Sequence, residues 1–576
     1  MKSRSNRTNN GVIGTNNLNN GSNGVLNNNK NTGLKSYFTT DPYVRPSDWL
    51  AMPTVNVGDQ KICILHAVFD TGTNFVSFRI TTDTGTYTVD WGDGTTTSYT
   101  SGNVASRNYD YATVGVVNPT PSSRGYRMAM ITITPTTGGA TITGFNFRDH
   151  QHPSCVVTNQ YSSGFLDVLM SAPNVTSVAF SGNGAGYVQH GILERFNWIG
   201  TSTVSSYNLF FWWCYSLQEV VNTPTENVTN VYGMFYHCFS LRKIPQILNT
   251  SKCTTFGYMF YNCGSLPYLP WMDTSNGTSF DIFAYGCTTV RYCPPYNLNK
   301  ATTTYLMFYN CYNLVEAPPF NLPVATNISY MFGNCRGLKK IGTLTTSLSL
   351  TNIGQLFISC ASLIEAPIIT NTSNATTCSE MFTGCSSLKT LPLFDTSKVT
   401  DFSYMFSFAS ALVSIPNFNT SLGQNFTQMF YYTLSLQTLP AINTSAGTNF
   451  TSFAELAGSL RTFTGLTLTG APTLTNMFTS CQALKIIPTM GVSSGAVMPA
   501  FNNLSSLQSC GITGIGQNVN FTNCQMGSTA LNSLYTSLAT VGASGAGAKT
   551  ITITGNWGAA TDTPSIATNK GWTVTG

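Results

Sequence analysis

The nine residues "YMFYNCGSL" (Tyr258–Leu266) return 48 residues later as "LMFYNCYNL" (Leu306–Leu314). Aligning the Met-Phe pairs and their near relatives extends the pattern to thirteen consecutive copies, each 23 to 25 residues after the last. The aligned position is Phe in eleven copies and Ala in two: Phe211, Phe235, Phe260, Ala284, Phe308, Phe332, Phe357, Phe382, Phe406, Phe430, Ala454, Phe478 and Phe501. Such a fixed period predicts a solenoid, because a unit this short cannot bury its own apolar face.

A cysteine follows the aligned position by three residues in nine copies: Cys214, Cys238, Cys263, Cys287, Cys311, Cys335, Cys360, Cys385 and Cys481. Four copies carry other residues there: Ala409, Thr433, Ala457 and Leu504. A zinc site needs close ligand pairs converging on one centre, and one cysteine per copy does not supply them. Parallel side chains also fit the torsion of a disulfide badly. The slot therefore predicts a buried ladder of free thiols, with no metal and no cofactor.

The rest of each copy adds a Leu six residues after the aligned Phe, often an "IP", "LP" or "AP" pair, and a polar "NTS" or "DTS". The consensus M-F-x-x-C-x-S-L, over about residues 209–507, closely resembles the BspA-type leucine-rich repeat of bacterial surface proteins and phage proteins. The resemblance implies a right-handed solenoid with one short parallel strand per repeat. The segment Ser171–Gly200 resembles a degenerate first turn that caps the array.

After Cys510 the period fails, and the pattern predicts a small α+β cap that shields the last turn from edge pairing. "STALNSLYTSLATV" (Ser528–Val541) has the pattern of an amphipathic helix. "DTPSIATNKG" (Asp562–Gly571) predicts a short helix, with Pro near its start and Gly at its end. "TITITGNW" (Thr550–Trp557) and the closing "WTVTG" predict strands.

One column of the array changes along the chain. The residue after the aligned position is aromatic in five consecutive copies: Trp212, Tyr236, Tyr261, Tyr285 and Tyr309. The run stops at Gly333, Ile358 and Thr383, and Tyr431 follows later. A local aromatic strip favours a contact surface for a glycan or another protein. Aromatic stacking that stiffens this half of the array is the alternative.

Before the array, residues 55–150 alternate with period two. "FVSFRITT" (Phe75–Thr82), "TYTVDWGDG" (Thr86–Gly94) and "YRMAMITITP" (Tyr126–Pro135) predict strands, and "NYDYATVG" (Asn108–Gly115) predicts a later one. The "WGDG" turn followed by a Y-x-Y segment resembles the PKD family, which implies an immunoglobulin-like β-sandwich used as a spacer or interaction module. Asp90 and Asp93 could bind a cation there, although side-chain capping of the turn is favoured.

The first 54 residues predict an extended anchoring arm. Twelve of the first 32 residues are Asn, and six of the first fifty are basic against two acidic, which accounts for +4 of the net charge of +5. Two apolar islands in this polar stretch, together with two arginines, are the expected anchoring residues: Arg4, Arg7, Val12, Ile13, Val25 and Leu26. "DPYVRPSDWLAMP" (Asp41–Pro53) is expected to clamp the arm to the first folded unit.

The amino-acid composition disfavours several classes of function. Charged residues make up 9% of the chain, against about 25% in an average soluble domain. The chain after residue 50 is nearly neutral, which disfavours a nucleic-acid-binding face. No apolar run in the sequence is long enough for a membrane span. We expect no secretory signal, and hence free thiols in a reducing cytoplasm.

Motifs of enzymes are not found: the sequence has no G-x-S-x-G, H-E-x-x-H or Walker loop and no glycosidase-like carboxylate pair. Asp149, His150, His152 and Cys155 could bind a metal, but packing in a loop is favoured. We therefore expect a protein that is not an enzyme.

Taken together, these features predict a mainly β chain with five parts: arm 1–54, sandwich 55–150, N-terminal solenoid cap 151–208, solenoid of about thirteen repeats 209–510 and C-terminal cap 511–576. The chain resembles virion structural proteins of tailed bacteriophages, and the "GVIG" of the arm resembles N-terminal segments of such proteins in marine phages. The resemblance implies a multicopy or homo-oligomeric fibre or decoration protein, assembled in the host cytoplasm and anchored to capsid, neck or tail. A bacterial cell-surface adhesin and a host-glycan depolymerase are the alternatives.

Overall fold

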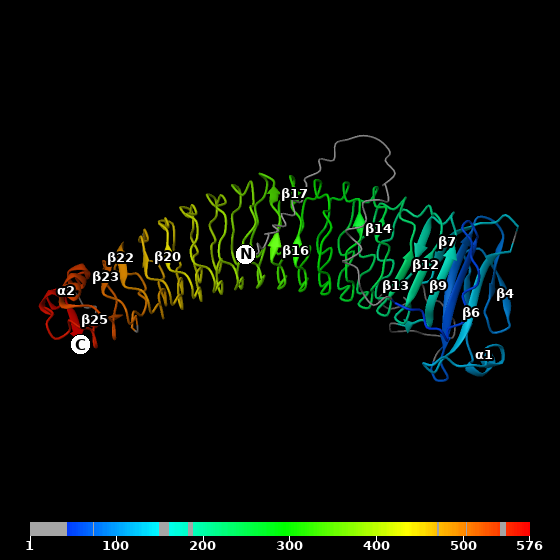
Figure 1. Cartoon of the computed structure of the whole chain (residues 1–576), viewed down its shortest axis with the longest axis horizontal. Helices are drawn as coiled ribbons and strands as arrows, with labels where there is room; N and C mark the ends of the chain where they lie inside the picture. The colour runs from blue at the N-terminus through cyan, green and yellow to red at the C-terminus, as the bar shows by residue number, and fades with distance from the viewer. Residues whose placement is uncertain are drawn as a thin grey trace, which may run out of the picture. The chain divides into compact units, whose positions relative to one another are not determined.

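The computed structural model describes residues 43–72, 74–136, 138–148, 161–182, 188–468, 472–502, 504–541 and 549–576. Two β-sheets lead into a stack of parallel turns, and a small α+β unit closes the chain (Figure 1). Helix is limited to three short segments of the described chain, namely α1, α2 and α3. The mainly β fold with a leucine-rich-repeat type of parallel solenoid is thereby confirmed.

The first unit consists of two sheets that share one core. One sheet contains β1 (Lys61–Val68), β3 (Thr86–Asp90), β4 (Thr96–Thr100) and β6 (Arg127–Pro135). The other contains β2 (Phe75–Thr82), β5 (Val104–Asn108), β7 (Ile142–Asn146) and β10 (Ser177–Ala179). Phe78 of β2 lies 5.7 Å from Trp91, just after β3, so the two inner faces meet. The strands expected near Phe75, Thr86 and Tyr126 are confirmed, while the PKD relationship stays a prediction.

The strand predicted over Asn108–Gly115 is wrong. The chain there leaves β5 at Asn108 and forms α1 (Tyr111–Val117). Asp110 caps this helix, because its carboxylate accepts hydrogen bonds from the N–H and the hydroxyl of Thr113, both at 2.8 Å. The alternating tyrosines suggested a strand, but a strong N-cap after Tyr109 decided the local structure.

The solenoid grows out of the larger sheet without a break. Strand β9 (Phe165–Ser171) pairs antiparallel with β1 on one side and parallel with β12 (Arg195–Trp198) on the other. Strand β12 then pairs parallel with β13 (Glu219–Asn222), so the change from sandwich to solenoid happens inside one sheet (Figure 1). The described part of the expected clamp packs here: Trp49 donates to the Tyr126 hydroxyl at 3.0 Å.

An unbroken ladder of parallel bridges links the turns. One residue per turn takes part, at thirteen positions: Ser206, Asn230, Thr255, Ser279, Thr303, Asn327, Asn352, Thr377, Asp401, Asn425, Asn449, Thr473 and Val497. Longer strands form at some turns only: β14 (Ile247–Leu248), β15 (Trp271–Met272), β16 (Glu316–Ala317), β17 (Phe320–Leu322), β18 (Lys340–Ile341), β19 (Leu344–Thr346), β20 (Thr438–Leu439), β21 (Thr462–Phe463), β22 (Ile486–Gly491) and β23 (Ser509–Thr513). The thirteen bridged positions match the thirteen copies of the motif.

Inside the solenoid the aligned phenylalanines form a stack of rings. From Phe308 to Phe430, neighbouring ring centroids lie 5.5 to 5.9 Å apart and neighbouring planes are within 18° of parallel. Ala284 and Ala454 interrupt the stack, but the residue before each is Phe where most copies have Met. The rings of Phe283 and Phe453 fill the space almost at right angles to the stack. The turns therefore keep close packing.

The polar "NTS" and "DTS" segments close each turn through side chains. The buried Thr250 hydroxyl donates to the carbonyl of Asp273 in the next turn at 2.8 Å. The same bond recurs at 2.6 to 2.8 Å from Thr274, Thr372, Thr396, Thr420 and Thr444. Each of these threonines satisfies a carbonyl that a loop would otherwise bury without a partner.

The C-terminal unit follows the predicted order. Strands β24 (Val519–Asn520), β25 (Lys549–Thr552) and β26 (Trp572–Thr575) form a parallel sheet, accompanied by α2 (Ser528–Ser537) and α3 (Ser565–Thr568). Leu531, Leu534 and Tyr535 of α2 are buried, which confirms the amphipathic helix expected there.

Candidate functional site

Each turn makes a tight corner around its Met-Phe pair. In "YMFYNCGSL" the corner is bracketed by Tyr258 and Asn262, whose φ angles of +57° and +56° lie in the left-handed region. Such backbone costs a non-glycine residue roughly 1–2 kcal/mol. Three N–H groups, those of Tyr258, Phe260 and Asn262, donate to carbonyls of the next turn at 2.7 to 3.1 Å and hold the corner. Corners of successive turns therefore present equivalent side chains in register.

The five aromatic residues predicted from the sequence lie together on these corners, and we call them the aromatic row: Trp212, Tyr236, Tyr261, Tyr285 and Tyr309. The four tyrosine rings stack face to face, with centroids 4.6, 5.0 and 5.3 Å apart and planes within 23° of parallel. Trp212 meets Tyr236 edge-on at 6.1 Å. All five side chains are half-buried, and the Nε1 of Trp212 is buried without a hydrogen-bond partner among the described residues.

Other aromatic residues, which the sequence analysis missed, flank the aromatic row. The ring centroids of Tyr258 and His237 lie 5.8 Å and 5.1 Å from that of Tyr261. With the aromatic row they form what we call the aromatic face; the flanking members are Trp213, Tyr215, Tyr232, His237, Phe239, Tyr258, Tyr305 and Tyr330. They belong to neighbouring columns of the alignment whose residue types vary between copies, so the repeat pattern did not single them out.

A glycine ends the aromatic row. The ring of Tyr309 leans over Gly333, where an added Cβ would come within 2.6 Å of that ring. The next two turns carry Ile358 and Thr383 in this slot. The aromatic row therefore has a defined end at Tyr309, and its last ring needs the space that glycine leaves.

Burial sets the charge state of the aromatic face. It raises the pKa of Tyr236, Tyr285 and Tyr309, and neighbouring tyrosines add to the effect. Burial also lowers the pKa of His237. Because phenols and imidazole are then neutral near pH 7, the aromatic face offers hydroxyl groups and ring edges but no charge.

The nine cysteines of the predicted ladder are all fully buried. Eight thiols donate to the carbonyl of the aligned residue in the preceding turn at 3.0 to 3.2 Å, as Cys263 does to Phe235. Burial raises the pKa of Cys214 and Cys385 to about 12, so these thiols stay protonated. Every described cysteine is free, and the ladder lies inside the turns, away from the aromatic face.

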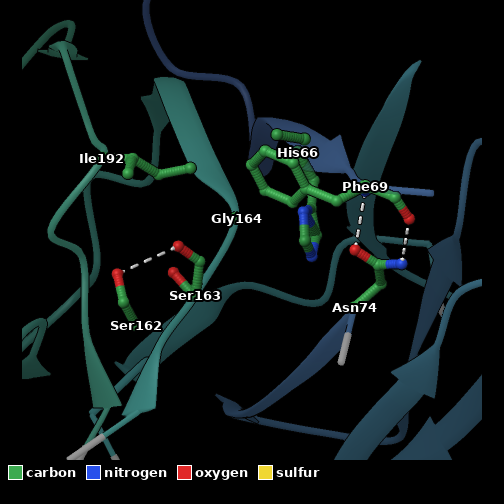
Figure 2. A pocket seen from close by; sticks show the side chains of 8 residues that line it. His66, Phe69, Asn74, Ser162, Ser163, Gly164 and Ile192 are labelled. Atoms are coloured by element: carbon green, nitrogen blue, oxygen red, sulfur yellow. Dashed lines mark hydrogen bonds between the residues drawn. The ribbon is translucent and has the colours of Figure 1, made fainter. Parts of the chain in front are cut away.

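A separate small cavity, of about 150 Å³, lies where β1 and β9 shift register (Figure 2). Its lining comes from β1, from the loop to β2, from β8 (Tyr161–Ser162) and from the segment after β11 (Val188–Gln189): His66, Ala67, Phe69, Asn74, Ser162, Ser163, Gly164 and Ile192. Burial lowers the pKa of His66 to about 3, and neither ring nitrogen has a partner among the described residues. An added Cβ on Gly164 would lie 2.2 Å from that ring, so glycine is required here.

Beside the cavity, a buried histidine holds a serine. His190 Nε2 lies 2.7 Å from the carbonyl of Phe180 and must donate to it. Its Nδ1 is then the acceptor for the Ser163 hydroxyl at 2.6 Å. Burial lowers the pKa of His190 to about 3, which makes it a poor general base, and Ser163 is itself buried. We assign this pair a structural role at the junction.

The other residues predicted to bind a cation, a metal or a partner either brace a turn or lie outside the described part of the chain. Asp90 accepts from the N–H of Gly92 at 2.9 Å, and Asp93 accepts from Thr95 and pairs with Arg107, so both carboxylates brace the "WGDG" turn. Outside the described residues lie the arm residues Arg4, Arg7, Val12, Ile13, Val25 and Leu26, and the loop residues Asp149, His150, His152 and Cys155.

Two kinds of site are absent from the described part of the chain. Nowhere in that part of the chain do three His, Cys, Asp or Glu side chains gather closely enough to hold a metal ion. None of its helices combines the length and apolar character that crossing a membrane requires.

Comparisons with known proteins bear on the repeats. Residues 207–345 and 351–463, less than half of the chain, match a protein-family model described as a Mycoplasma protein of unknown function, DUF285. A search of curated proteins found no match.

Solved structures similar to the chain include a leucine-rich repeat protein from Eubacterium ventriosum, with 15% identity, 58% of this chain and 83% of that chain covered, and a TM-score of 0.28. A TLR13–ssRNA13 complex has 13% identity and a TM-score of 0.18, with 69% of this chain and 66% of that chain covered. The plant peptide hormone receptor RGFR1 in complex with RGF2 has 11% identity and a TM-score of 0.17, with 73% of this chain and 71% of that chain covered. Likenesses at these identities and TM-scores carry no information about ligand or partner.

Proposed function

We propose that the chain is a non-enzymatic attachment protein whose aromatic face contacts a glycan or protein on a host surface. The observation that carries this proposal is the aromatic row itself. Its four tyrosine rings are stacked in register and half-exposed on four consecutive turns, with Trp212 edge-on at one end, whereas later turns keep the same interior without such a row. Clustered aromatic edges with free hydroxyls are a common feature of contact surfaces, and solenoids serve as extended binding scaffolds.

In finer detail, we propose a virion structural protein of a tailed bacteriophage. The arm, with Arg4, Arg7 and the islands at Val12–Ile13 and Val25–Leu26, would anchor the chain to capsid, neck or tail. The solenoid would then project as a fibre or decoration. The concentration of basic residues in the first fifty positions supports a docking arm, and protonated, buried thiols suit assembly in a reducing cytoplasm.

A bacterial cell-surface adhesin is the second candidate, and the match of the repeats to a family model of bacterial proteins of unknown function is consistent with it. Both candidates use the aromatic face in the same way and differ in where the chain is mounted. Mass spectrometry of purified phage particles and of host envelope fractions distinguishes them. Detection in particles supports the virion assignment, and detection only in the envelope replaces it with the adhesin.

The aromatic face is tested by the double substitution Tyr261→Ala with Tyr285→Ala. Because these rings are central in the aromatic row, we expect adsorption to host cells to weaken by roughly tenfold or more. The matched control is Tyr404→Ala with Tyr432→Ala, which removes two exposed tyrosines from later turns and should leave adsorption unchanged. Unchanged adsorption in the first variant would remove the proposed function.

A further inference from the structure

The tyrosines of the aromatic row expose their edges rather than their faces. Each face of Tyr261 is covered by a neighbouring ring, that of Tyr236 at 4.6 Å and that of Tyr285 at 5.0 Å. The hydroxyls of Tyr236, Tyr261, Tyr285 and Tyr309 make no hydrogen bond to any other described residue. The four tyrosines of the aromatic row therefore offer a line of hydroxyl groups, one on each of four consecutive turns, rather than open platforms for stacking.

Amide side chains lie beside this line at two of the left-handed positions that follow row residues, Asn262 and Asn310; the other three positions hold Trp213, His237 and Gly286. Asn310 Oδ1 accepts from Asn334 Nδ2 at 2.6 Å, which leaves the Nδ2 of Asn310 available as a donor. Asn262 leans over Gly286, where an added Cβ would lie 2.1 Å from its Oδ1, and that oxygen is available as an acceptor. Phenol and amide groups together can donate to and accept from a ligand rich in hydroxyls.

The aromatic row and the left-handed positions beside it, together called the strip, contain no charged residues. Between Leu209 and Asn334, no Lys, Arg, Asp or Glu occupies the aromatic row or the left-handed positions on either side of it. The nearby carboxylate of Asp281 is engaged by the Thr303 hydroxyl at 2.7 Å and the Tyr305 N–H at 3.2 Å. Arg336, at the far end, donates to Asn334 and lies over Tyr312. An acidic polymer would find no countercharge along the strip, so its matching ligand is neutral.

From this arrangement we infer that the aromatic row binds a neutral, linear polysaccharide that runs along it, with one sugar residue over each turn. The inference rests on the proposed function and specifies its ligand class. The turns repeat at the spacing of parallel strands, about 4.8 Å, and an extended chain of hexoses linked through opposite ends of the ring advances by a similar step. The four tyrosine hydroxyls and, at the other end, the half-buried ring of Trp212 define a site for five sugars that ends at Gly333.

The inference is tested by calorimetry on the full chain. The probes are tri-, penta- and heptasaccharides of β-1,4-linked glucose, mannose and N-acetylglucosamine, with oligogalacturonates of equal length as acidic controls. At least one neutral series should bind about tenfold more tightly as pentamer than as trimer, because two further sugars contact the row, one at a tyrosine hydroxyl and one at the Trp212 ring. Beyond five sugars, affinity should change by less than about twofold. Oligogalacturonates should not bind.

A conservative variant isolates the hydroxyls. Tyr261→Phe keeps the stacked ring and removes one hydroxyl, so affinity for the pentamer should fall by about threefold to tenfold. Tyr404→Phe, in a later turn, is the matched control and should bind as the unaltered chain does, and circular dichroism confirms that both variants fold. Equal binding by Tyr261→Phe, preference for the acidic series, or affinity independent of length would each overturn the inference.

The test also separates this inference from the proposed function. If the double alanine variant of Tyr261 and Tyr285 loses host adsorption while no neutral oligosaccharide binds, the aromatic face contacts a protein and only the inference fails. If adsorption survives in that variant, the proposed function and the inference fail together.

Discussion

The turns that carry the aromatic row and the turns that follow it share one interior and differ outside. The ring stack continues across the boundary, from Phe308 to Phe332 at 5.5 Å and on to Phe357 at 5.9 Å. The exposed slot changes there from Tyr309 to Gly333 and Ile358. The solenoid therefore does not need aromatic residues in that slot. The buried ring stack, which is constant along the chain, maintains the fold. The exposed slot, which changes from turn to turn, can take part in binding.

A second boundary, three turns further along the chain, separates a cysteine-rich region from a region with few ladder thiols. Every turn from Cys214 to Cys385 has a cysteine in the ladder slot, whereas the following three turns have Ala409, Thr433 and Ala457. Packing is preserved, because all these side chains are fully buried. Their chemistry is not equivalent, because a thiol can ionise and alanine cannot. Alkaline pH should therefore separate the two regions.

The largest expected effect is alkaline opening that begins in the cysteine-rich turns. A thiol of the unfolded chain ionises near pH 8.5, whereas burial raises the pKa of Cys214 and Cys385 to about 12 in the folded chain. Between these values the folded state binds more protons, so the free energy of unfolding falls as pH rises. Each such thiol contributes about 1.4 kcal/mol per pH unit, and below pH 8.5 the full stability is present.

Pulsed alkylation with iodoacetamide, followed by peptide mass spectrometry between pH 8 and pH 11, measures this opening at each cysteine. We expect Cys238 and Cys360 to be labelled at lower pH than Cys481, which stands alone beyond the alanine turns. A variant with Cys335→Ala and Cys360→Ala should shift the opening of its region to higher pH. Labelling of all three sites at one pH would show that the two regions do not differ.

The second prediction concerns the shared interior. Phe332→Ala and Phe406→Ala each remove a fully buried ring from the same stack, one beside the aromatic row and one beyond it. Each should lower the free energy of unfolding by about 3–5 kcal/mol, as measured by guanidinium denaturation followed by circular dichroism. Because the surroundings are equivalent, the two losses should agree within about 1 kcal/mol. A larger gap would mean that the interiors are not equivalent.

These interior effects are the ones that the sequence could predict. Thirteen aligned copies revealed the solenoid, its period and the burial of Cys263, because a packing requirement repeats in every copy. The strand predicted at Asn108–Gly115 failed, since a single side-chain cap from Asp110 outweighed the alternating pattern. The sequence also gave no sign that β9 would join antiparallel and parallel partners in one sheet, because that pairing depends on residues far apart in the chain.

The candidate site was only partly visible in the sequence. The aromatic row follows from one column of the alignment, but the flanking Tyr258 and Asn262 belong to columns that vary between copies. Their relevance depends on the left-handed corner, which no residue type in those columns signals. The face-to-face stacking of Tyr236, Tyr261 and Tyr285 likewise required the structure, and it changes the expected contact from ring faces to hydroxyl groups.

The third prediction weighs the alternative in which the aromatic row only stiffens its half of the solenoid. Tyr285→Ala removes two stacked contacts, each worth about 0.5–1.5 kcal/mol. We therefore expect a loss of about 1–3 kcal/mol in the free energy of unfolding, below that of Phe332→Ala. Denaturation of both variants under the same conditions provides the comparison. An equal loss for both variants would show that the aromatic row stabilises the solenoid as much as the buried rings do. That result would favour a stiffening role for the aromatic row over a role as a contact surface.

The smallest effect should come from building aromatic pairs where the chain has none. Ile358 and Thr383 occupy the row slot in two adjacent later turns and are half-buried. Ile358→Tyr and Thr383→Tyr should each change the free energy of unfolding by no more than about 0.5–1 kcal/mol. The Thr383 substitution also removes a hydrogen bond, because the Thr383 hydroxyl donates to the Tyr404 carbonyl. Together they should couple favourably by about 0.5–1.5 kcal/mol in a double-mutant cycle, because equivalent corners bring the new rings into stacking distance. A coupling of zero would show that the stacking from Tyr236 to Tyr309 depends on its flanking residues rather than on the repeat corner alone.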